Sequence, residues 1–230
     1  MCFSEPVSFT TSVILVSGGI YSINQAFSNK EYLPFACVPL IFGIQQGFEG
    51  VVWKGINSGS SSTIYFGAMT FLFFSHWFWL FWIPFMISCL EHNWIKKMIC
   101  DYFVVIGIIY GAFLYIPLLF NGDWLVVDAI RGSIHYHARF LGGSVPVELS
   151  RLLYAMIVLI PLCTSSRMDV RVWGILISFL ALISRLLFNY AFVSVWCFFT
   201  ALISVYIIHV VLKLSKWSSD IDRSNTEVGS

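Results

Sequence analysis

Long apolar segments alternate with short polar ones along the whole chain. Because a helix needs roughly 20 apolar residues to cross a membrane, this pattern predicts seven transmembrane helices. We expect them at residues 9–27, 33–53, 64–90, 99–120, 147–164, 170–188 and 192–212. The last two segments are nearly continuous, and Asn189-Tyr190 is the expected hairpin between them. The sequence therefore predicts an all-α, seven-helix polytopic bundle over residues 1–214, followed by a polar tail, 215–230.

Lysine and arginine are distributed unequally between the two sides of the predicted bundle. Positively charged residues favour the cytoplasmic side of a membrane, which here predicts an outer N-terminus and an inner C-terminus. The inner side then holds Lys30, Lys96, Lys97, Arg167, Arg171, Lys213, Lys216 and Arg223, and the outer side holds Lys54, Arg131 and Arg139. The outer loop 121–146 is long and partly apolar. We expect it to fold back over the outer mouth of the bundle.

The composition agrees with a membrane protein. The chain is 58% hydrophobic and 11% charged, whereas soluble domains carry about 25% charged residues. Membrane lipids are therefore the expected surroundings and partners. The chain has no basic run and no nucleic-acid motif, so a nucleic-acid partner is not expected. Its start has no basic region before the first apolar segment, which is therefore expected to be retained.

Several polar side chains fall inside the predicted helices, mostly in their outer halves. Such residues usually face a bundle interior or a watered cavity, since a charge at the membrane centre costs roughly 2.5–3.5 kcal/mol on insertion scales. The pattern predicts an outward-facing cavity with Glu49 and His76 as catalytic groups. The expected substrate-binding residues are Gln45, Gln46, Arg151 and Arg185.

Each of these residues also has a structural interpretation. Glu49 and Arg185 are predicted at matching depth, where they would form a buried ion pair that fixes helix packing. Gln45 and Gln46 would form hydrogen bonds between helices, and His76 would be a hydrogen-bonded core residue. Glu148 and Arg151, three residues apart on one helix, would form a local surface pair.

The stretch "SIHYH" suggests a metal site in the outer loop. If the stretch is extended, His135 and His137 point the same way, and two such imidazoles form half of a zinc or copper site. Asp128, Glu49 or His76 would complete it; the alternative is a solvated loop. The six cysteines include no CxxC pair. Cys2 is expected outside, at a depth similar to that of Cys197, where the two would form a disulfide, supply a thiol nucleophile or be ordinary interfacial cysteines.

Several stretches resemble an uncharacterised family of bacterial multi-pass membrane proteins whose members begin with Met-Cys-Phe-Ser. They are "MCFS", "PLIFGIQQGFEGVVW", "SHWFW", "GSIHYH" and "SVWCFFTALIS". The resemblance implies a bacterial cytoplasmic membrane and no particular activity. Residues 192–212 lack the lysine that binds retinal in microbial rhodopsins, so no retinal is expected. The last helix has only His209 where alkaline-ceramidase-like zinc hydrolases have an HxxxH pair.

Two functions fit this pattern of residues. The first is a membrane-embedded hydrolase, metal-assisted by zinc, that acts on an anionic lipid or lipid-like substrate at the outer leaflet. Glu49 would be the general base or a metal ligand, and Arg151 and Arg185 would hold the head group. His76, His135 and His137 would be metal ligands or acid/base groups. The second is a non-catalytic sensor or accessory membrane subunit that holds a small molecule in its outer cavity. A transporter is disfavoured because the chain shows no inverted repeat.

Overall fold

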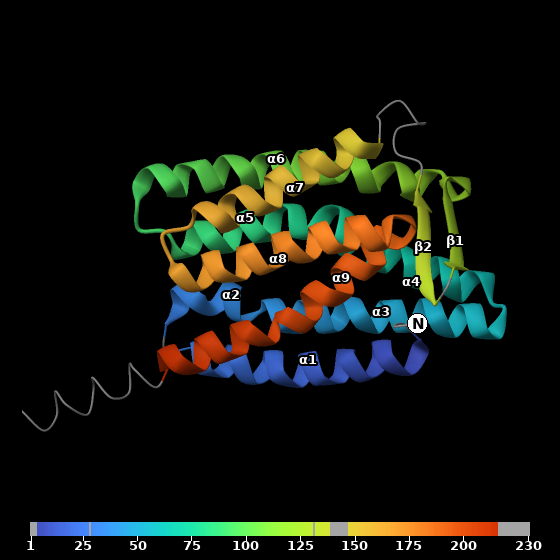
Figure 1. The fold of residues 1–230 in the computed structure, drawn as a ribbon, viewed down its shortest axis with the longest axis horizontal. Coiled ribbons are helices and arrows are strands. Elements are labelled where there is room, and N and C mark those ends of the chain that lie inside the picture. The colour runs from blue at the N-terminus through green and yellow to red at the C-terminus, as the bar shows by residue number, and fades with distance from the viewer. Residues whose placement is uncertain (1–3, 28, 131, 139–146, 216–230) are drawn as a thin grey trace, which may run out of the picture.

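The structure, a computed structural model, describes residues 4–27, 29–130, 132–138 and 147–215. Within these ranges, seven helical segments are long and apolar enough to cross a membrane. They are Glu5–Ala26, Lys30–Ser58, Ser61–Leu90, Trp94–Phe120, Val147–Thr164, Met168–Leu187 and Asn189–Ser215. Each contains or closely matches one predicted segment, which confirms the prediction of seven helices of spanning length. Figure 1 shows them running along a common long axis.

Three of the seven segments are composite: the second, the third and the last, which begins with the 3-10 turn Asn189–Ala191. The second consists of a 3-10 turn (Lys30–Tyr32), α2 (Leu33–Ala36) and α3 (Val38–Ser58). The third consists of α4 (Ser61–Phe73), a π-helical turn (Phe74–Phe78) and α5 (Trp79–Leu90). The remaining helices are α1 (Glu5–Ala26), α6 (Trp94–Phe120), α7 (Val147–Thr164), α8 (Met168–Leu187) and α9 (Phe192–Ile203), which continues as helix to Ser215 after a turn at Ser204.

Local sequence signals explain where several helices begin and end. Proline at the start of α2 and of α3 fits the first helical turn, where its missing N–H group is not needed. Gly59 ends α3 with a φ of 68°, in the left-handed region that glycine adopts without strain. Asn93 is the N-cap of α6, and its side chain accepts a hydrogen bond from the Lys96 amide at 3.1 Å. The predicted turn at Asn189-Tyr190 is confirmed as a 3-10 turn, Asn189–Ala191.

Glycines allow two pairs of helices to approach closely. A Cβ atom on Gly19 of α1 would lie 2.4 Å from the backbone nitrogen of Leu40 in α3. A Cβ atom on Gly107 of α6 would lie 2.1 Å from the carbonyl oxygen of Leu80 in α5. Real Cβ atoms do not approach so closely. Both contacts therefore require glycine, as is typical of helix interfaces in membrane proteins.

The loops lie at two ends of the bundle (Figure 1). The end that we call the hairpin end holds the start of α1, the turn between α3 and α4, and the turn Asn189–Ala191. The described part of the predicted outer loop also lies there. It forms an antiparallel hairpin of β1 (Leu125–Ile130) and β2 (Ser133–Ala138). The predicted helical bundle is therefore confirmed, and the outer loop adds one two-stranded hairpin that was not predicted.

At the opposite end, which we call the Glu91 end, a buried carboxylate connects two loops by hydrogen bonds. Glu91 follows α5 and is 4% exposed. The Ser165 hydroxyl and the Ser166 backbone N–H, both in the α7–α8 turn, donate to Glu91 Oε1 at 2.7 and 2.6 Å. Burial by itself would raise the pKa of Glu91, but these hydrogen bonds outweigh it and hold the pKa below its usual value. One charged side chain thus joins two loops of the bundle.

Candidate functional site

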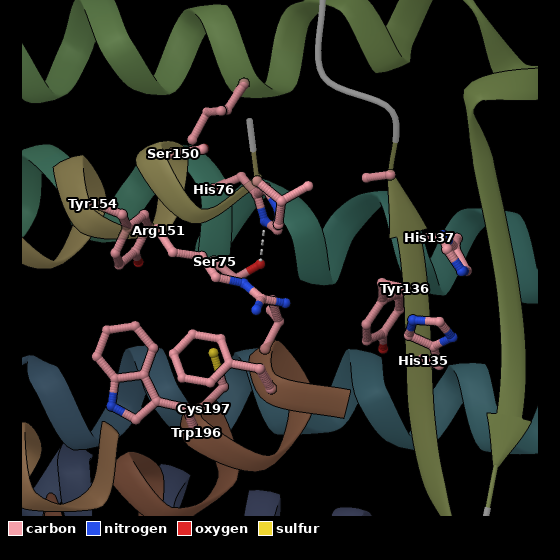
Figure 2. Close-up of a pocket in the computed structure, with 15 residues that line it drawn as sticks. Ser75, His76, His135, Tyr136, His137, Ser150, Arg151, Tyr154, Trp196 and Cys197 are labelled. Carbon is pink, nitrogen blue, oxygen red and sulfur yellow. Dashed lines mark hydrogen bonds between the residues drawn. The ribbon is translucent and has the colours of Figure 1, made fainter. Parts of the chain in front are cut away.

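A cavity of about 190 Å³ lies at the hairpin end, among α7, α9, β2 and the π-helical turn (Figure 2). Its wall combines hydroxyl, imidazole, guanidinium and thiol groups with large apolar side chains. The lining residues are Ser75, His76, Leu114, His135, Tyr136, His137, Ala138, Val147, Ser150, Arg151, Tyr154, Phe192, Val193, Trp196 and Cys197. Drug-sized ligands usually occupy roughly 300–1,000 Å³. This cavity therefore fits a small ligand or one part of a larger ligand.

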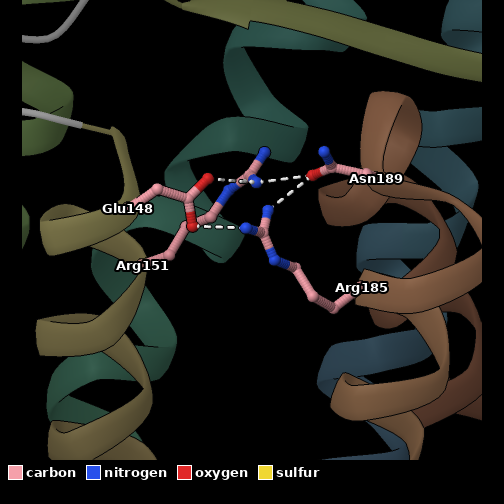
Figure 3. Close-up of polar contacts among 4 residues, drawn as sticks. All are labelled: Glu148, Arg151, Arg185 and Asn189. Carbon is pink, nitrogen blue, oxygen red and sulfur yellow. Dashed lines mark hydrogen bonds and ion pairs between the residues drawn. The ribbon is translucent and has the colours of Figure 1, made fainter.

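Two arginines beside the cavity share one carboxylate (Figure 3). Arg185 of α8 donates to Glu148 Oε2 at 2.6 Å and to Asn189 Oδ1 at 2.6 Å. Arg151 of α7 donates to the same Asn189 oxygen at 2.8 Å and lies 3.5 Å from Glu148 Oε1. The predicted local pair of Glu148 and Arg151 is thus confirmed. Two guanidinium groups against one carboxylate leave one positive charge in excess.

This charged cluster contributes little to stability and much to orientation. The side chain of Glu148 is 64% exposed, and exposed ion pairs usually contribute about 0–1 kcal/mol. The shared partners nevertheless hold Arg151 in one direction, and its guanidinium carbon lies 5.2 Å from the ring centre of Phe192. Of the two arginines, Arg151 alone lines the cavity. Arg185 therefore acts on the cavity through Glu148 and Asn189.

One face of α7 carries the polar wall beside Arg151. Ser150 and Tyr154, four residues apart, lie on the same helical face and both line the cavity. The Tyr110 hydroxyl of α6 lies 2.7 Å from the Ser150 hydroxyl, which fixes α7 against α6 at this level. The Tyr154 ring packs edge-on against Trp196 of α9 at 5.6 Å between ring centres. The spacing of these residues in the sequence predicts that they share one helical face. Of this wall, only Arg151 was predicted.

The π-helical turn brings His76 to the cavity. Such turns insert one extra residue into an α-helix and occur often at functional sites. Here Ser75 and His76 both line the cavity and are both buried, at 4% and 7% exposure. The Ser75 hydroxyl lies 2.8 Å from His76 Nδ1 (Figure 2). Gly111 of α6 gives the turn room, because a Cβ atom there would lie 2.6 Å from Trp77 Cδ1.

Strand β2 of the hairpin covers the cavity, and His135, Tyr136, His137 and Ala138 contribute to its lining. Tyr136 packs against Phe71 of α4 at 4.9 Å between ring centres, and its hydroxyl is buried without a hydrogen-bond partner among the described residues. Burial raises the pKa of Tyr136 well above its usual value, and the nearby Glu49 carboxylate adds to the rise. The phenol therefore reaches in toward α3. Tyr136, like the rest of this wall except the two histidines, was not predicted.

His135 and His137 point the same way, as predicted, on the side of β2 away from Tyr136 (Figure 2). Their ring centres are 4.2 Å apart. Partial burial lowers the pKa of His135, and His137 and Arg151 lower it further against the opposing effect of Asp128. No group of three or more His, Cys, Asp or Glu residues in the described ranges is arranged to hold a metal. Zinc sites use at least three protein ligands, so zinc binding at His135 and His137 stays a prediction.

Glu49, Gln45 and Gln46 lie in α3 outside the cavity lining. All three are fully buried. The Ser194 hydroxyl of α9 donates to Glu49 Oε1, and Trp79 Nε1 of α5 donates to Gln45 Oε1 at 2.7 Å. The interpretation of Gln45 as a hydrogen bond between helices is therefore confirmed. Of the predicted lining residues, His76, His135, His137 and Arg151 are in the cavity wall, whereas Glu49, Gln46 and Arg185 are not.

The predicted ion pair between Glu49 and Arg185 is wrong. Arg185 is in the last turn of α8, and its side chain is 37% exposed and paired with Glu148. Glu49 takes part in no ion pair within the described part of the chain. Similar depth along two helices did not bring the side chains together, because the helices present them to different neighbours. Cys197 is a buried free thiol in the cavity wall, whereas Cys2 lies outside the described residues.

A bundle of seven apolar helices of spanning length, with a mixed polar and apolar cavity at one end, is the architecture of a multi-pass membrane protein. The chain belongs to the family of unknown function DUF6629, whose model matches residues 1–220. This match confirms the expected membership of an uncharacterised family. No curated protein and no solved structure matches the chain. Function therefore has to be argued from the cavity itself.

Proposed function

We propose that this protein is a membrane-embedded binding protein that holds a small anionic, lipid-like molecule in the cavity at its hairpin end. The observation that carries the proposal is Arg151. It lies in the wall of a largely apolar cavity, beside a cluster with one positive charge in excess. Arginine presents a fork of N–H donors that matches the oxygens of carboxylate and phosphate groups. The role fits a sensor or accessory membrane subunit.

The rest of the cavity supports an anionic ligand with an apolar part. Ser75, His76 and Ser150 place further polar groups in the wall. Leu114, Val147, Phe192 and Trp196 provide apolar surface for the remainder of the ligand. Excluding water from such a site strengthens an ion pair, because the effective dielectric constant is lower than in bulk water.

The distribution of charge supports an orientation with the hairpin end outside and the Glu91 end in the cytoplasm. The described lysines and arginines at the Glu91 end are Lys30, Lys96, Lys97, Arg167, Arg171 and Lys213. Those at the hairpin end are Lys54, Arg151 and Arg185. The positive-inside rule then places the cavity on the outer face of a membrane, which the sequence resemblance suggests is a bacterial cytoplasmic membrane. Labelling with an impermeant thiol reagent tests this orientation. Lys96→Cys should be protected in intact cells, and labelling of this cysteine from outside would show that the orientation is the opposite one.

Binding is tested with butyl phosphate, titrated calorimetrically into the full chain in nanodiscs of zwitterionic lipid. We expect saturable binding that weakens tenfold or more in Arg151→Gln. The matched control is Arg171→Gln, which removes an arginine at the Glu91 end and should leave the affinity unchanged. Equal loss in both variants, or no saturable binding to the unmodified protein, would contradict the proposal.

A second candidate is the membrane-embedded hydrolase, and one observation favours it. The Ser75 hydroxyl and His76 Nδ1 are hydrogen-bonded in the cavity wall that also holds Arg151, and a serine beside a base is a common nucleophile. In this candidate Ser75 attacks an ester whose anionic group lies against Arg151. Release of nitrophenol from a nitrophenyl ester, abolished in Ser75→Ala but retained in the control Ser178→Ala, which lies outside the cavity lining, would favour the hydrolase over the binding protein.

A further inference from the structure

A second, smaller cavity lies next to the first one. Its volume is about 30 Å³. Tyr154, Trp196 and Cys197 line both cavities, so they form a shared wall between them. The remaining lining residues come from α3, α5, α7, α8 and α9: Phe42, Trp79, Ile83, Val158, Ile177 and Thr200. The walls of the second cavity therefore come from helices deeper in the bundle, away from the hairpin.

The two cavities differ in chemistry. The first has Arg151, two serines and His76 in its wall, whereas the second has no charged residue. Its walls are mainly aromatic rings and branched aliphatic side chains. The indole N–H of Trp79 is already bonded to Gln45, and the Trp79 ring stacks on Phe42 at 4.0 Å between ring centres. Cavities of this kind stay dry and accept apolar groups.

We infer that the ligand of the proposed function is a single-chain anionic amphiphile. Its head group lies against Arg151, and its alkyl chain passes beside Cys197, the smallest residue of the shared wall, into the second cavity. The inference rests on the proposed function and narrows its ligand class. Arg151 and Val158 are seven residues apart on α7, which corresponds to about 10 Å. A chain that uses the second cavity must therefore be of medium length, and the small volume of about 30 Å³ favours a single chain.

The test compares butyl phosphate with octyl phosphate on the full chain in nanodiscs. Each additional methylene that enters an apolar site should tighten binding about fourfold. We therefore expect octyl phosphate to bind at least tenfold more tightly than butyl phosphate. The variant Ile177→Phe fills the second cavity and should remove this gain while leaving the affinity for butyl phosphate unchanged.

A matched variant controls for partition into the lipid. Ile175 lies on the same helix but is 60% exposed, so Ile175→Phe should keep the preference for the octyl chain. If Ile177→Phe does not fold, Ile177→Ala provides the opposite test, because enlarging the cavity should increase the preference for octyl over butyl phosphate. Equal affinity for the two chains, or a preference that neither variant at Ile177 changes, would overturn the inference. Failure of both phosphates to bind would instead overturn the proposed function.

Discussion

The two ends of the bundle differ in how their polar side chains are buried and bonded. At the Glu91 end, one carboxylate that is 4% exposed accepts two short hydrogen bonds from the neighbouring loop. At the hairpin end, four polar groups share bonds in an open cluster beside a cavity. Hydrogen bonds to charged groups contribute about 1.5–3 kcal/mol each, whereas exposed ion pairs contribute about 0–1 kcal/mol. The comparison indicates that the polar contacts at the Glu91 end contribute more to stability than those at the hairpin end, which agrees with the binding role that we propose for the hairpin end.

The largest expected effect is at the Glu91 end. Glu91→Ala should lower the free energy of unfolding by about 3 kcal/mol, because it strands the donors of Ser165 and Ser166. It should leave the affinity for butyl phosphate unchanged. Unfolding in mixed micelles measures the first quantity and calorimetry the second. Glu31→Ala is the control, since the side chain of Glu31 is 50% exposed and its contact with His92 is 3.6 Å.

The same carboxylate predicts a dependence of stability on pH. The folded-state pKa of Glu91 is lowered, so its contribution is complete above the unfolded pKa of about 4.3. The contribution is lost as the pH falls through the folded pKa. The unmodified protein should therefore lose stability below about pH 4, and Glu91→Gln should lose less over the same range. If the free energy of unfolding falls equally with pH in the two proteins, Glu91 is not the origin of this pH dependence.

The next effect concerns the polar contact between α3 and α9. Ser194→Ala removes the hydroxyl that donates to Glu49 and leaves a fully buried carboxylate without this partner. We expect a loss of about 2 kcal/mol in the free energy of unfolding. Combining it with Glu49→Gln should recover part of that loss, because the double variant no longer buries a carboxylate. Ser194→Ala could instead abolish ligand binding without loss of stability. The bond between Ser194 and Glu49 would then serve ligand binding and not stability, which would contradict our assignment of the two roles.

In the charged cluster, two substitutions should change the affinity for butyl phosphate by smaller factors and in opposite directions. Arg185→Gln leaves Glu148 to neutralise Arg151, and should weaken binding of butyl phosphate by about fivefold, or about 1 kcal/mol. Glu148→Gln raises the excess positive charge and should strengthen binding by a similar factor. Both variants should change the free energy of unfolding by less than about 1 kcal/mol. Weaker binding in both variants would show that geometry, and not charge, sets the affinity.

The smallest effect is expected at His135 and His137, which line the cavity from the side of β2 away from Tyr136. His135→Ala and His137→Ala should each change the free energy of unfolding by less than about 0.5 kcal/mol, as surface substitutions usually do. Binding of butyl phosphate should stay within twofold of the unmodified protein. Melting curves recorded with zinc and with a chelator complete the test. A zinc-dependent rise in melting temperature that both substitutions abolish would support the predicted zinc site.

The sequence predicted the helices better than the contacts between them. Apolar segment length is a local property, so all seven segments and the turn at Asn189 could be located. The pairing of Glu49 with Arg185 was predicted from depth alone, and depth does not fix the direction in which a helix presents a side chain. Strand alternation correctly placed His135 and His137 on one side of β2, but it also implied that Tyr136 points the opposite way, toward the bundle. That implication was the missed signal for the cavity wall.

The π-helical turn Phe74–Phe78 has a consequence for how the two ends are coupled. One residue corresponds to about 100° of rotation in an α-helix, so the extra residue acts as a phase shift between α4 and α5. The face that α4 presents to the hairpin is thereby decoupled from the face that α5 presents toward the Glu91 end. Sequence changes that suit one end need not disturb the other, even though a single continuous helix connects them. The turn can thus present Ser75 and His76 to the cavity while α5 keeps its own packing toward the Glu91 end.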